Sequence, residues 1–431
     1  MRWLLVLVLA LTPPAWATPG RETLEKTPGW ALLTPVRIVW ESAVLLRQAR
    51  HLQSTAPLAS LSRRLEELRG LKFRYPVRYT VMTPEGVRRF LDEQIELHYP
   101  IERQRRDERM LVLLGMVPPD FKLRPFLLDL MQEQVAGAYD PIHDYFFVVL
   151  REQSWLNKAL KNADEDAMIT LHELDHALQN QRFDLKARQM ELVKLGNSDR
   201  ELGFAGLIEG DATSVMYDLM LARQGTNSAE SGMSMEAMGA MLSIVPLPGM
   251  GKFREAPLYF QRQLMFPYMV GCDFINSLRR YGGWELVNEC YARQPISSEQ
   301  IYHPERYLAD EKPLPLPFTL SLPGWKELGQ DTGGEFTLRV FLEQHAVRSH
   351  RWAAEGWGND RIAIYEKDGQ HCLVWLTRWD SAAEAEEFER AARAALGKAP
   401  GRWRLKGAGD RVLLARDLSA EQWSRALSLL R

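Results

Sequence analysis

The 431-residue sequence has few cysteines, no surplus of either charge and no long apolar run. Its cysteines, Cys272, Cys290 and Cys372, are odd in number, which excludes a closed disulfide framework. A bridge between Cys272 and Cys290 stays open, although each thiol is better explained as a small buried apolar residue. The 54 basic and 56 acidic residues leave a formal charge of −2, so the basic surface of a nucleic-acid-binding protein is missing. We therefore expect no nucleic acid partner.

The first 17 residues have the three parts of a secretory signal peptide. Residues 1–2 supply a positive charge, residues 3–11 are apolar, and Ala15-Trp16-Ala17 is a small-residue cleavage site. The apolar run is too short to span about 30 Å of hydrocarbon, and no other segment reaches 18 uninterrupted apolar residues. We predict cleavage after Ala17 and a mature protein without a stable membrane span, exported to the periplasm, the cell surface or the medium.

Hydrophobic periodicity predicts an α+β fold in two folded parts. After a helical N-terminal segment at 18–72, residues 73–320 are expected to form a mostly helical domain with a small mixed sheet. A Pro-rich connector at 311–318 precedes a small α+β domain at 333–431. In the first domain, a helix over 256–281 is expected to kink at Pro267. The sequence does not indicate an oligomeric state.

Two other segments of the first domain leave alternatives open. Residues 136–139 and 145–150 flank an Asp-Pro turn and predict a β-hairpin. The apolar run 145–150 fits a sheet edge that binds extended peptide by strand addition and, equally, a buried strand. The Met- and Gly-rich segment 228–251 fits a lid over a site or, more simply, part of the core. Insertion of residues 233–250 into a membrane is weaker, because the segment carries Pro, Gly and Glu236.

The segment His172-Glu173-Leu174-Asp175-His176 is an H-E-x-x-H motif within an apolar-periodic stretch. On an α-helix, positions four apart lie about one turn apart on the same face. Both imidazoles can therefore reach one metal ion while Glu173 lies beside it. A catalytic zinc usually has three protein ligands and an open position for water. Glu209, 33 residues beyond His176 in a helix-compatible stretch of small residues, is the best candidate for the third ligand.

These residues carry a resemblance to a known group of proteins. His172-Glu-Leu-Asp-His176 followed by Glu209-Gly-Asp-Ala resembles the gluzincin clan of metallopeptidases, in which a Glu from a second helix completes a His₂Glu zinc site. More closely, several segments resemble a group of largely uncharacterised exported zincin-like proteins of bacteria and archaea: residues 133–141, 172–184, 209–213, 298–305 and 356–361. The resemblance implies a zincin-like fold for residues 73–320.

The resemblance also implies a role for each residue of the motif. His172, His176 and Glu209 would hold one Zn²⁺ per chain, and Glu173 would act as general base. Asp211 could orient a ligand histidine from the second shell, with Asp184 and Asp218 as competitors. In thermolysin-like members an Asp lies four residues beyond the Glu ligand, whereas this chain has Thr213.

A group that stabilises the oxyanion of the transition state is also expected. His303, Tyr217 and Tyr302 are the candidates, and a purely structural role for His303 is the simpler interpretation.

Two functions are compatible with the sequence. The first is an exported zinc metallopeptidase, an endopeptidase, which hydrolyses a peptide or protein substrate through a metal-activated water. The second is a zinc-containing but non-catalytic envelope or surface protein that binds or assembles partners. Because every group needed for the chemistry is present, we favour the enzyme.

Overall fold

The computed structural model describes residues 55–135, 137–149, 163–232, 234–237 and 251–431. The predicted signal peptide at 1–17 and most of the N-terminal segment therefore lie outside the described residues. The same holds for most of the Met-rich segment, although Ala229 and Met235 at its described positions are buried.

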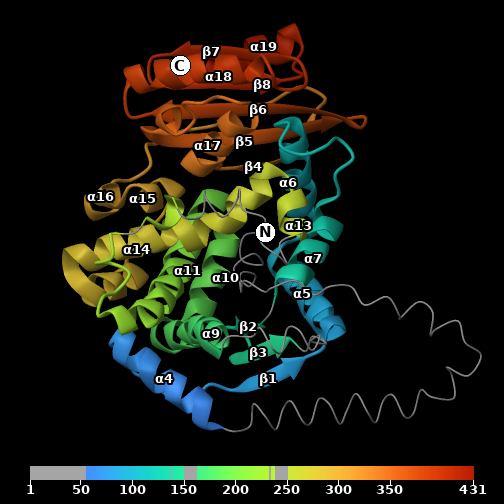
Figure 1. Ribbon diagram of the computed structural model, residues 1–431. Helices are drawn as coiled ribbons and strands as arrows, with labels where there is room; N and C mark the ends of the chain where they lie inside the picture. Colours follow the sequence, from blue (N-terminus) through green and yellow to red (C-terminus); the bar gives the residue numbers. More distant parts are fainter. Residues whose placement is uncertain (1–54, 136, 150–162, 233, 238–250) are drawn as a thin grey trace, which may run out of the picture.

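Helices dominate the chain as far as residue 308 (Figure 1). They are α4 (Thr55–Arg69), α5 (Pro84–His98), α6 (Ile101–Leu113), α7 (Leu123–Gln134), α9 (Ala163–Phe183), α10 (Leu185–Leu195), α11 (Ser198–Leu221), η2 (Ala222–Gln224), α13 (Gly251–Glu255), α14 (Leu258–Ala292), α15 (Ser298–Tyr302) and α16 (Pro304–Leu308). The strands of this part are β1 (Tyr79–Met82), β2 (Gly137–Asp140) and β3 (Tyr145–Val149).

The small sheet is mixed, with the order β1-β3-β2. The predicted hairpin is confirmed, because β2 pairs antiparallel with β3. On its other side β3 pairs parallel with β1, so β3 is the central strand. Of the two alternatives left open for residues 145–150, the sheet edge is therefore wrong, since the distant strand β1 covers that side of β3 and makes β3 a central strand. The edge strand that contacts α9 is β2.

The chain beyond residue 325 forms a five-stranded antiparallel sheet with the order β4-β5-β6-β8-β7. Its elements are β4 (Lys326–Asp331), α17 (Gly334–Gln344), η3 (Trp352–Ala354), β5 (Trp357–Lys367), β6 (Gln370–Trp379), α18 (Ala382–Leu396), β7 (Trp403–Ala408), β8 (Arg411–Arg416), α19 (Ala420–Ala426) and η4 (Leu427–Leu430). Strand β4 belongs to this sheet although it precedes residue 333, the expected start of the C-terminal domain. The α+β class is confirmed.

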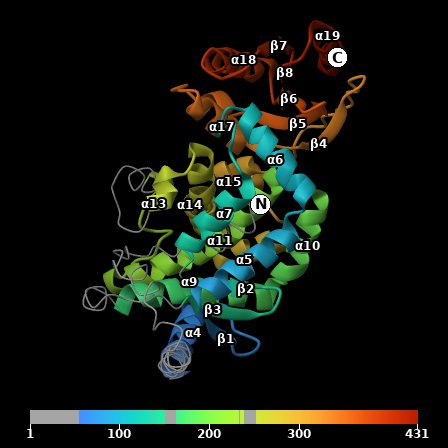
Figure 2. The same cartoon turned by 90° about the vertical axis from the view of Figure 1, so that its right-hand side faces the viewer.

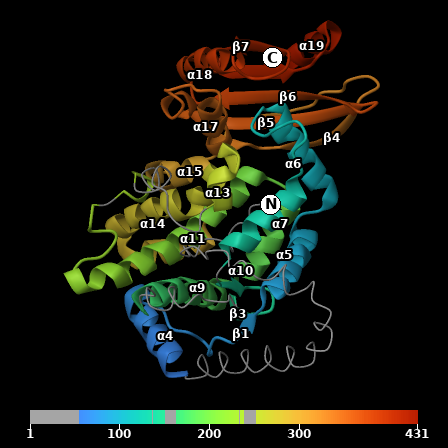
Figure 3. The same ribbon diagram turned by 45° about the vertical axis from the view of Figure 1, so that its right-hand side comes forward.

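The molecule has a sheet at each end and helices between them (Figures 1 and 3). One apolar cluster runs from Phe260 of α14 through Phe341 of α17 to Trp375 of β6, so the C-terminal sheet shares a core with the helices. Figure 2 shows α6 reaching this sheet, where the Arg106 guanidinium lies 2.7 Å from the Asp331 carboxylate.

Helices α11 and α14 approach each other unusually closely, through glycines. A Cβ at Gly210 would lie 2.3 Å from the Gly271 backbone, and a Cβ at Gly271 would lie 2.3 Å from the Gly206 oxygen. Any larger side chain at these positions would push the two helices apart. This contact fixes the depth and rotation of α11, the helix that carries Glu209.

Gly282 and Gly283 depart from helical geometry inside α14, directly after residue 281, where the expected helix ends. Pro267 lies inside α14, and the kink expected there stays a prediction. Gly283 has a φ of 67°, a left-handed conformation that glycine adopts without strain.

All three cysteines are free and buried, which excludes the Cys272–Cys290 bridge. Among the described residues, no helix combines the length and apolarity needed to cross a membrane.

Candidate metal centre

The H-E-x-x-H residues lie on α9, and their side chains are buried. His172, Glu173 and His176 are 5%, 7% and 6% exposed, and Glu209 of the neighbouring helix α11 is fully buried. The two imidazole rings meet edge to face, with centroids 4.8 Å apart. The structure thus brings together the three residues predicted as ligands, from two helices that pack on each other.

Three side-chain atoms converge on one point. The His172 Nε2 and Glu209 Oε2 atoms are 3.1 Å apart, the two His Nε2 atoms are 3.1 Å apart, and His176 Nε2 lies 3.4 Å from Glu209 Oε2. Ligand atoms around a tetrahedral zinc, with bonds of about 2.0–2.1 Å, are separated by about 3.3–3.4 Å. The separations therefore fit a single zinc ion held by all three side chains.

The hydrogen bonding of this cluster is incomplete, which is a second test of the fit. Glu209 Oε1 is buried and has no hydrogen-bond partner among the described residues. Two imidazole nitrogens 3.1 Å apart can form a hydrogen bond only if one of them carries a proton. A buried carboxylate oxygen without a partner costs about 1–3 kcal/mol. Two imidazoles and one carboxylate are a ligand set that catalytic zinc uses.

Negative charge dominates the electrostatics of the cluster. Burial lowers the pKa of His176, but the carboxylates of Glu209, Glu173 and Asp175 together raise it to about 10. Burial raises the pKa of Glu173 to about 8, and the charge of Glu209 adds to this effect. Burial and the nearby Asp211 carboxylate raise the pKa of Asp175 to about 7. Such an excess of carboxylates favours a bound cation.

The main chain of β2 positions Glu173. Tyr139 N donates to Glu173 Oε2 at 2.9 Å. Phe146, which is the partner of Tyr139 in β3, donates its own N–H to Arg78 on the opposite side. Antiparallel pairs alternate in this way, so Gly137 and Tyr139 direct their main-chain groups away from β3. The outer edge of β2 therefore lies along the proposed general base.

Gln179, which the sequence analysis missed, supports His176. Its Oε1 lies 3.3 Å from His176 Nδ1, and its Nε2 donates to Asp175 Oδ2 at 2.6 Å and to Ile208 O at 3.1 Å. Because the Nε2 amide group is held twice, Oε1 is the atom presented to His176. An Nδ1–H directed at Gln179 leaves Nε2 with its lone pair toward Glu209. Only the spacing of three residues from His176 could have suggested this role.

The three carboxylates considered as acceptors for a ligand histidine, those of Asp211, Asp184 and Asp218, have other partners. Asp211 accepts from Arg69 Nε and Nη2, both at 2.9 Å, and from the Tyr291 hydroxyl at 2.8 Å. Asp184 caps α10 by accepting from Ala187 N. Asp218 pairs with Arg279 at 2.7 Å. Asp211 thus pairs with a buried arginine from α4 and with Tyr291, and among the described residues no hydrogen bond joins it to a ligand histidine.

Thr213, which departs from the thermolysin-like pattern, is buried on α11. Its hydroxyl has no hydrogen-bond partner among the described residues. It thus makes no hydrogen bond to a ligand side chain in place of the Asp found in thermolysin-like members.

The candidates for oxyanion stabilisation are also placed. His303 Nε2 lies 3.1 Å from Glu335 of α17, and Nδ1 lies 3.5 Å from Glu305. The ring of Tyr302 is covered by the Arg339 guanidinium at 3.8 Å. His303 and Tyr302 thus interact with α17 rather than with the three predicted ligands. Tyr217, in the same helix as Glu209, is half-buried.

Tyr268 of α14 is the tyrosine that contacts the cluster. Its ring stacks on that of His172, with centroids 5.9 Å apart and an interplanar angle of 21°. It is only 4% exposed. The sequence does not indicate this contact, because residue 268 lies 96 positions beyond His172 and no local pattern connects the two.

Comparisons with known proteins give little about activity. Residues 321–423, the C-terminal sheet region, match the family model of a domain of unknown function (DUF8575). No curated protein matches the chain. One solved structure that matches is described as that of a "putative hydrolase with a novel fold from Chloroflexus aurantiacus". It is 19% identical, with a TM-score of 0.36, and the match covers 61% of this chain and 89% of the other.

Proposed function

We propose that this protein is a zinc-dependent hydrolase that cleaves peptide bonds, with His172, His176 and Glu209 as metal ligands and Glu173 as general base. The observation that carries the proposal is the convergence of three ligand atoms within 3.4 Å of one another, one helical position from a buried glutamate. In such a site zinc lowers the pKa of a bound water to about 7 and polarises a carbonyl.

The residues of this chain would do the remaining work. Glu173 Oε2 accepts from Tyr139 N, so the carboxylate keeps one orientation and Oε1 is the atom that can take a proton from water. The same oxygen can then return the proton to the leaving amine. Burial raises the pKa of Glu173, and a cation held beside it would act in the opposite direction by favouring the carboxylate, the form that accepts a proton.

The edge of β2 supports a peptide as substrate. An extended peptide that adds to a sheet edge is held by main-chain hydrogen bonds, which do not depend on its side chains. Gly137 and Tyr139 direct their main-chain groups toward this edge, where Tyr139 N already donates to Glu173. All four residues of β2 are buried, so a peptide would add to this edge only by displacing the segments that cover it. A peptide bound there would present its backbone, rather than a side chain, to the general base.

The full-length protein tests the proposal in three measurements. Metal analysis should find one zinc per chain, a fluorogenic peptide library should be cleaved, and a chelator should abolish cleavage until zinc is restored. Glu173→Gln should keep the zinc and lose about 10²–10⁴-fold in rate, the usual value of a general base. Glu102→Gln, an exposed glutamate of α6, is the matched control.

Two outcomes would decide against the mechanism. If Glu173→Gln cleaves peptides at the wild-type rate, Glu173 is not the general base. Stoichiometric zinc without any turnover instead favours the non-catalytic binding or assembly protein. Export to the periplasm or cell surface is part of the proposal, and cell fractionation tests it separately.

A further inference from the structure

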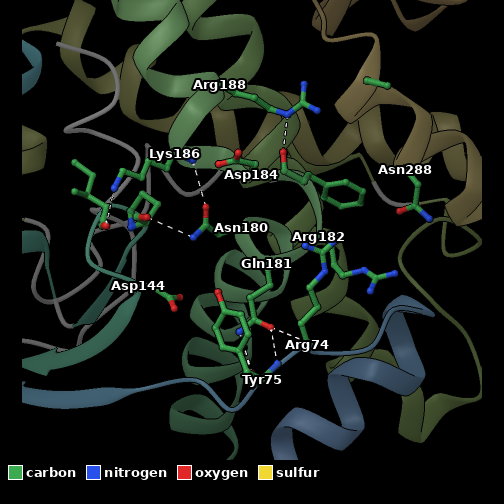
Figure 4. Close-up of a pocket in the computed structure, with 14 residues that line it drawn as sticks. Arg74, Tyr75, Asp144, Asn180, Gln181, Arg182, Asp184, Lys186, Arg188 and Asn288 are labelled. Carbon is green, nitrogen blue, oxygen red and sulfur yellow. Dashed lines mark hydrogen bonds between the residues drawn. The ribbon is translucent and has the colours of Figure 1, made fainter.

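We infer that a basic pocket beside the proposed metal centre binds a carboxylate of the peptide substrate; this inference rests on the proposed function and assigns its substrate class. The pocket lies at the C-terminal end of α9 and has a volume of about 610 Å³. Figure 4 shows its lining, which comes from the segment before β1, the β2–β3 turn, and helices α9, α10 and α14.

The pocket carries more positive than negative charge. Its cations are Arg74, Arg182, Lys186 and Arg188, and its anions are Asp144 and Asp184. The C-terminus of α9 contributes about −0.5 of an elementary charge. The positive charge of the four cations therefore exceeds that of the two carboxylates and this helix end by about one and a half elementary charges. The pocket therefore attracts an anion.

The four cations also have N–H groups without a hydrogen-bond partner among the described residues. None of the four has a carboxylate within 4.0 Å among the residues that the structure describes. Arg188 uses Nε to bind Phe183 O, which leaves its two terminal amino groups, and Lys186 binds Ile142 O. Arg74 and Arg182, both exposed, make no side-chain hydrogen bond with a described residue. A planar guanidinium binds a carboxylate through two parallel hydrogen bonds.

The two carboxylates of the pocket have hydrogen-bond partners other than its cations, so the cations are left without counter-charges. Asp144 accepts from the Tyr139 hydroxyl at 2.5 Å and lies 3.9 Å from Arg78, which is outside the pocket. Asp184 caps α10. Neither carboxylate neutralises a cation of the pocket.

The pocket continues the site in two directions. Along α9, Asn180 lies four residues after His176 and seven after Glu173, so it shares their face of the helix, about 6 Å further on. Along the sheet, the turn residues Pro141 and Ile142 follow the edge strand β2 directly. The Asn180 amide joins the two, because it donates to the Tyr139 hydroxyl at 2.8 Å.

These distances predict which part of the substrate reaches the pocket. An extended peptide advances about 3.3 Å per residue. Asn180 lies about 10 Å along α9 from Glu173, and Arg182 about 13 Å. A peptide on the β2 edge, with its scissile bond at Glu173, would therefore bring its third or fourth residue from that bond over the cations. We therefore expect a preference for Asp or Glu at that position, or for a free C-terminal carboxylate there. The side of the scissile bond that shows the preference gives the direction of the peptide relative to β2.

The first test uses acetylated, amidated fluorogenic peptides that differ only by Glu or Gln at one position. We expect wild-type protein to prefer the Glu peptide by about tenfold in kcat/KM, the order of one or two charge-assisted hydrogen bonds. High salt should reduce the preference. Arg182→Gln and Arg74→Gln, from different segments, should each lower it about threefold, and Arg105→Gln, an exposed arginine of α6, should not.

A third peptide with a free C-terminus at the same position separates the two sources of the carboxylate. Preference for a side-chain carboxylate or for the chain terminus supports the pocket in either case. Equal cleavage of all three peptides, or an unchanged preference in the double variant Arg74→Gln/Arg182→Gln, overturns it.

A binding measurement keeps this inference distinct from the proposed hydrolysis. Calorimetric titration of the Glu173→Gln protein with the Glu and Gln peptides needs no turnover. If wild-type protein cleaves nothing, but the Glu peptide still binds more tightly and Arg74→Gln/Arg182→Gln removes most of the difference, the proposed hydrolysis is wrong and the pocket is supported. If peptides are cleaved without any charge preference, the hydrolysis is supported and only the inference that the pocket binds a carboxylate is wrong.

Discussion

Two fully buried carboxylates, Asp360 in the C-terminal sheet and Glu209 in α11, show opposite ways of placing a charge inside this protein. Asp360 accepts four hydrogen bonds: from the main-chain N–H groups of Gly333 and Gly334, at 2.9 and 2.8 Å, and from the indoles of Trp357 and Trp375, both at 2.9 Å. Every donor comes from the chain itself. Asp360 therefore joins the start of α17 to the sheet as a closed structural unit.

Glu209 is equally buried but its surroundings are incomplete. One oxygen faces two imidazoles, and the other has no partner among the described residues. Buried polar groups in native proteins are almost always satisfied, and an exception calls for a ligand, a strained site or catalysis. The two carboxylates thus differ in what completes their hydrogen bonding: protein donors for Asp360 and, in our proposal, a zinc ion for Glu209.

The largest expected effect comes from removing the proposed ligand. Glu209→Ala should weaken zinc binding on the order of a thousandfold, beyond the 10–100-fold that a second-shell partner is worth. Competition with a chromophoric chelator measures the affinity. Asp360→Asn is the control, because it alters a buried carboxylate that does not face the centre. Equal zinc affinity in Glu209→Ala and wild-type protein would remove the distinction between the two carboxylates.

A second substitution tests the four hydrogen bonds that Asp360 accepts. Asp360→Ala leaves four buried N–H donors without an acceptor, at about 1–3 kcal/mol each, so the free energy of unfolding should fall by about 4 kcal/mol or more. The loss should be the same with and without zinc. Asp360→Asn should lose less, since its amide oxygen still accepts from two donors. Thermal and urea unfolding give the values, and a wild-type unfolding temperature for Asp360→Ala would contradict the account.

A smaller effect is expected at Gln179. Gln179→Leu removes the acceptor for His176 Nδ1 and should weaken zinc binding by about 10–100-fold. Gln189→Leu, at a buried glutamine of α10, is the matched control. The visible spectrum of the cobalt-substituted protein should change in the first variant only. If both variants lose zinc equally, Gln179 acts through packing rather than through His176.

The smallest effect concerns His303 and its dependence on pH. Burial lowers the pKa of His303, but the hydrogen bond and charge of Glu335, with Glu305, outweigh burial and the charge of Arg339, so the pKa is raised overall. A raised folded-state pKa contributes stability below the ordinary value of about 6.5, and the contribution is lost as pH rises through the folded value. His303→Gln should therefore destabilise the protein more at pH 5.5 than at pH 8.5. A difference that grows with pH would contradict the Glu335 pairing.

Much of the fold was predictable because it follows from local patterns. The helix of the H-E-x-x-H motif, the β2–β3 hairpin and most elements of the C-terminal sheet are visible in periodicity and turn residues. Glu209 was found because its short spacing and small-residue context matched a known arrangement. The position of β3 in its sheet stayed open between an edge and a buried strand, because strand order depends on β1, more than 60 residues earlier in the chain.

The sequence by itself determined which side chains share a helix face: His172 and His176 are four residues apart, and helical geometry leaves them no other relation. Only the tertiary structure decided what completes that face. It brought Glu209 to the two imidazoles through the glycine contact of α11 with α14, and it gave both Asp211 oxygens to Arg69, 142 residues away. The physical reason is that periodicity is a property of neighbouring residues, whereas the partner of a buried charge is chosen by whichever donor the packing of distant elements brings within reach.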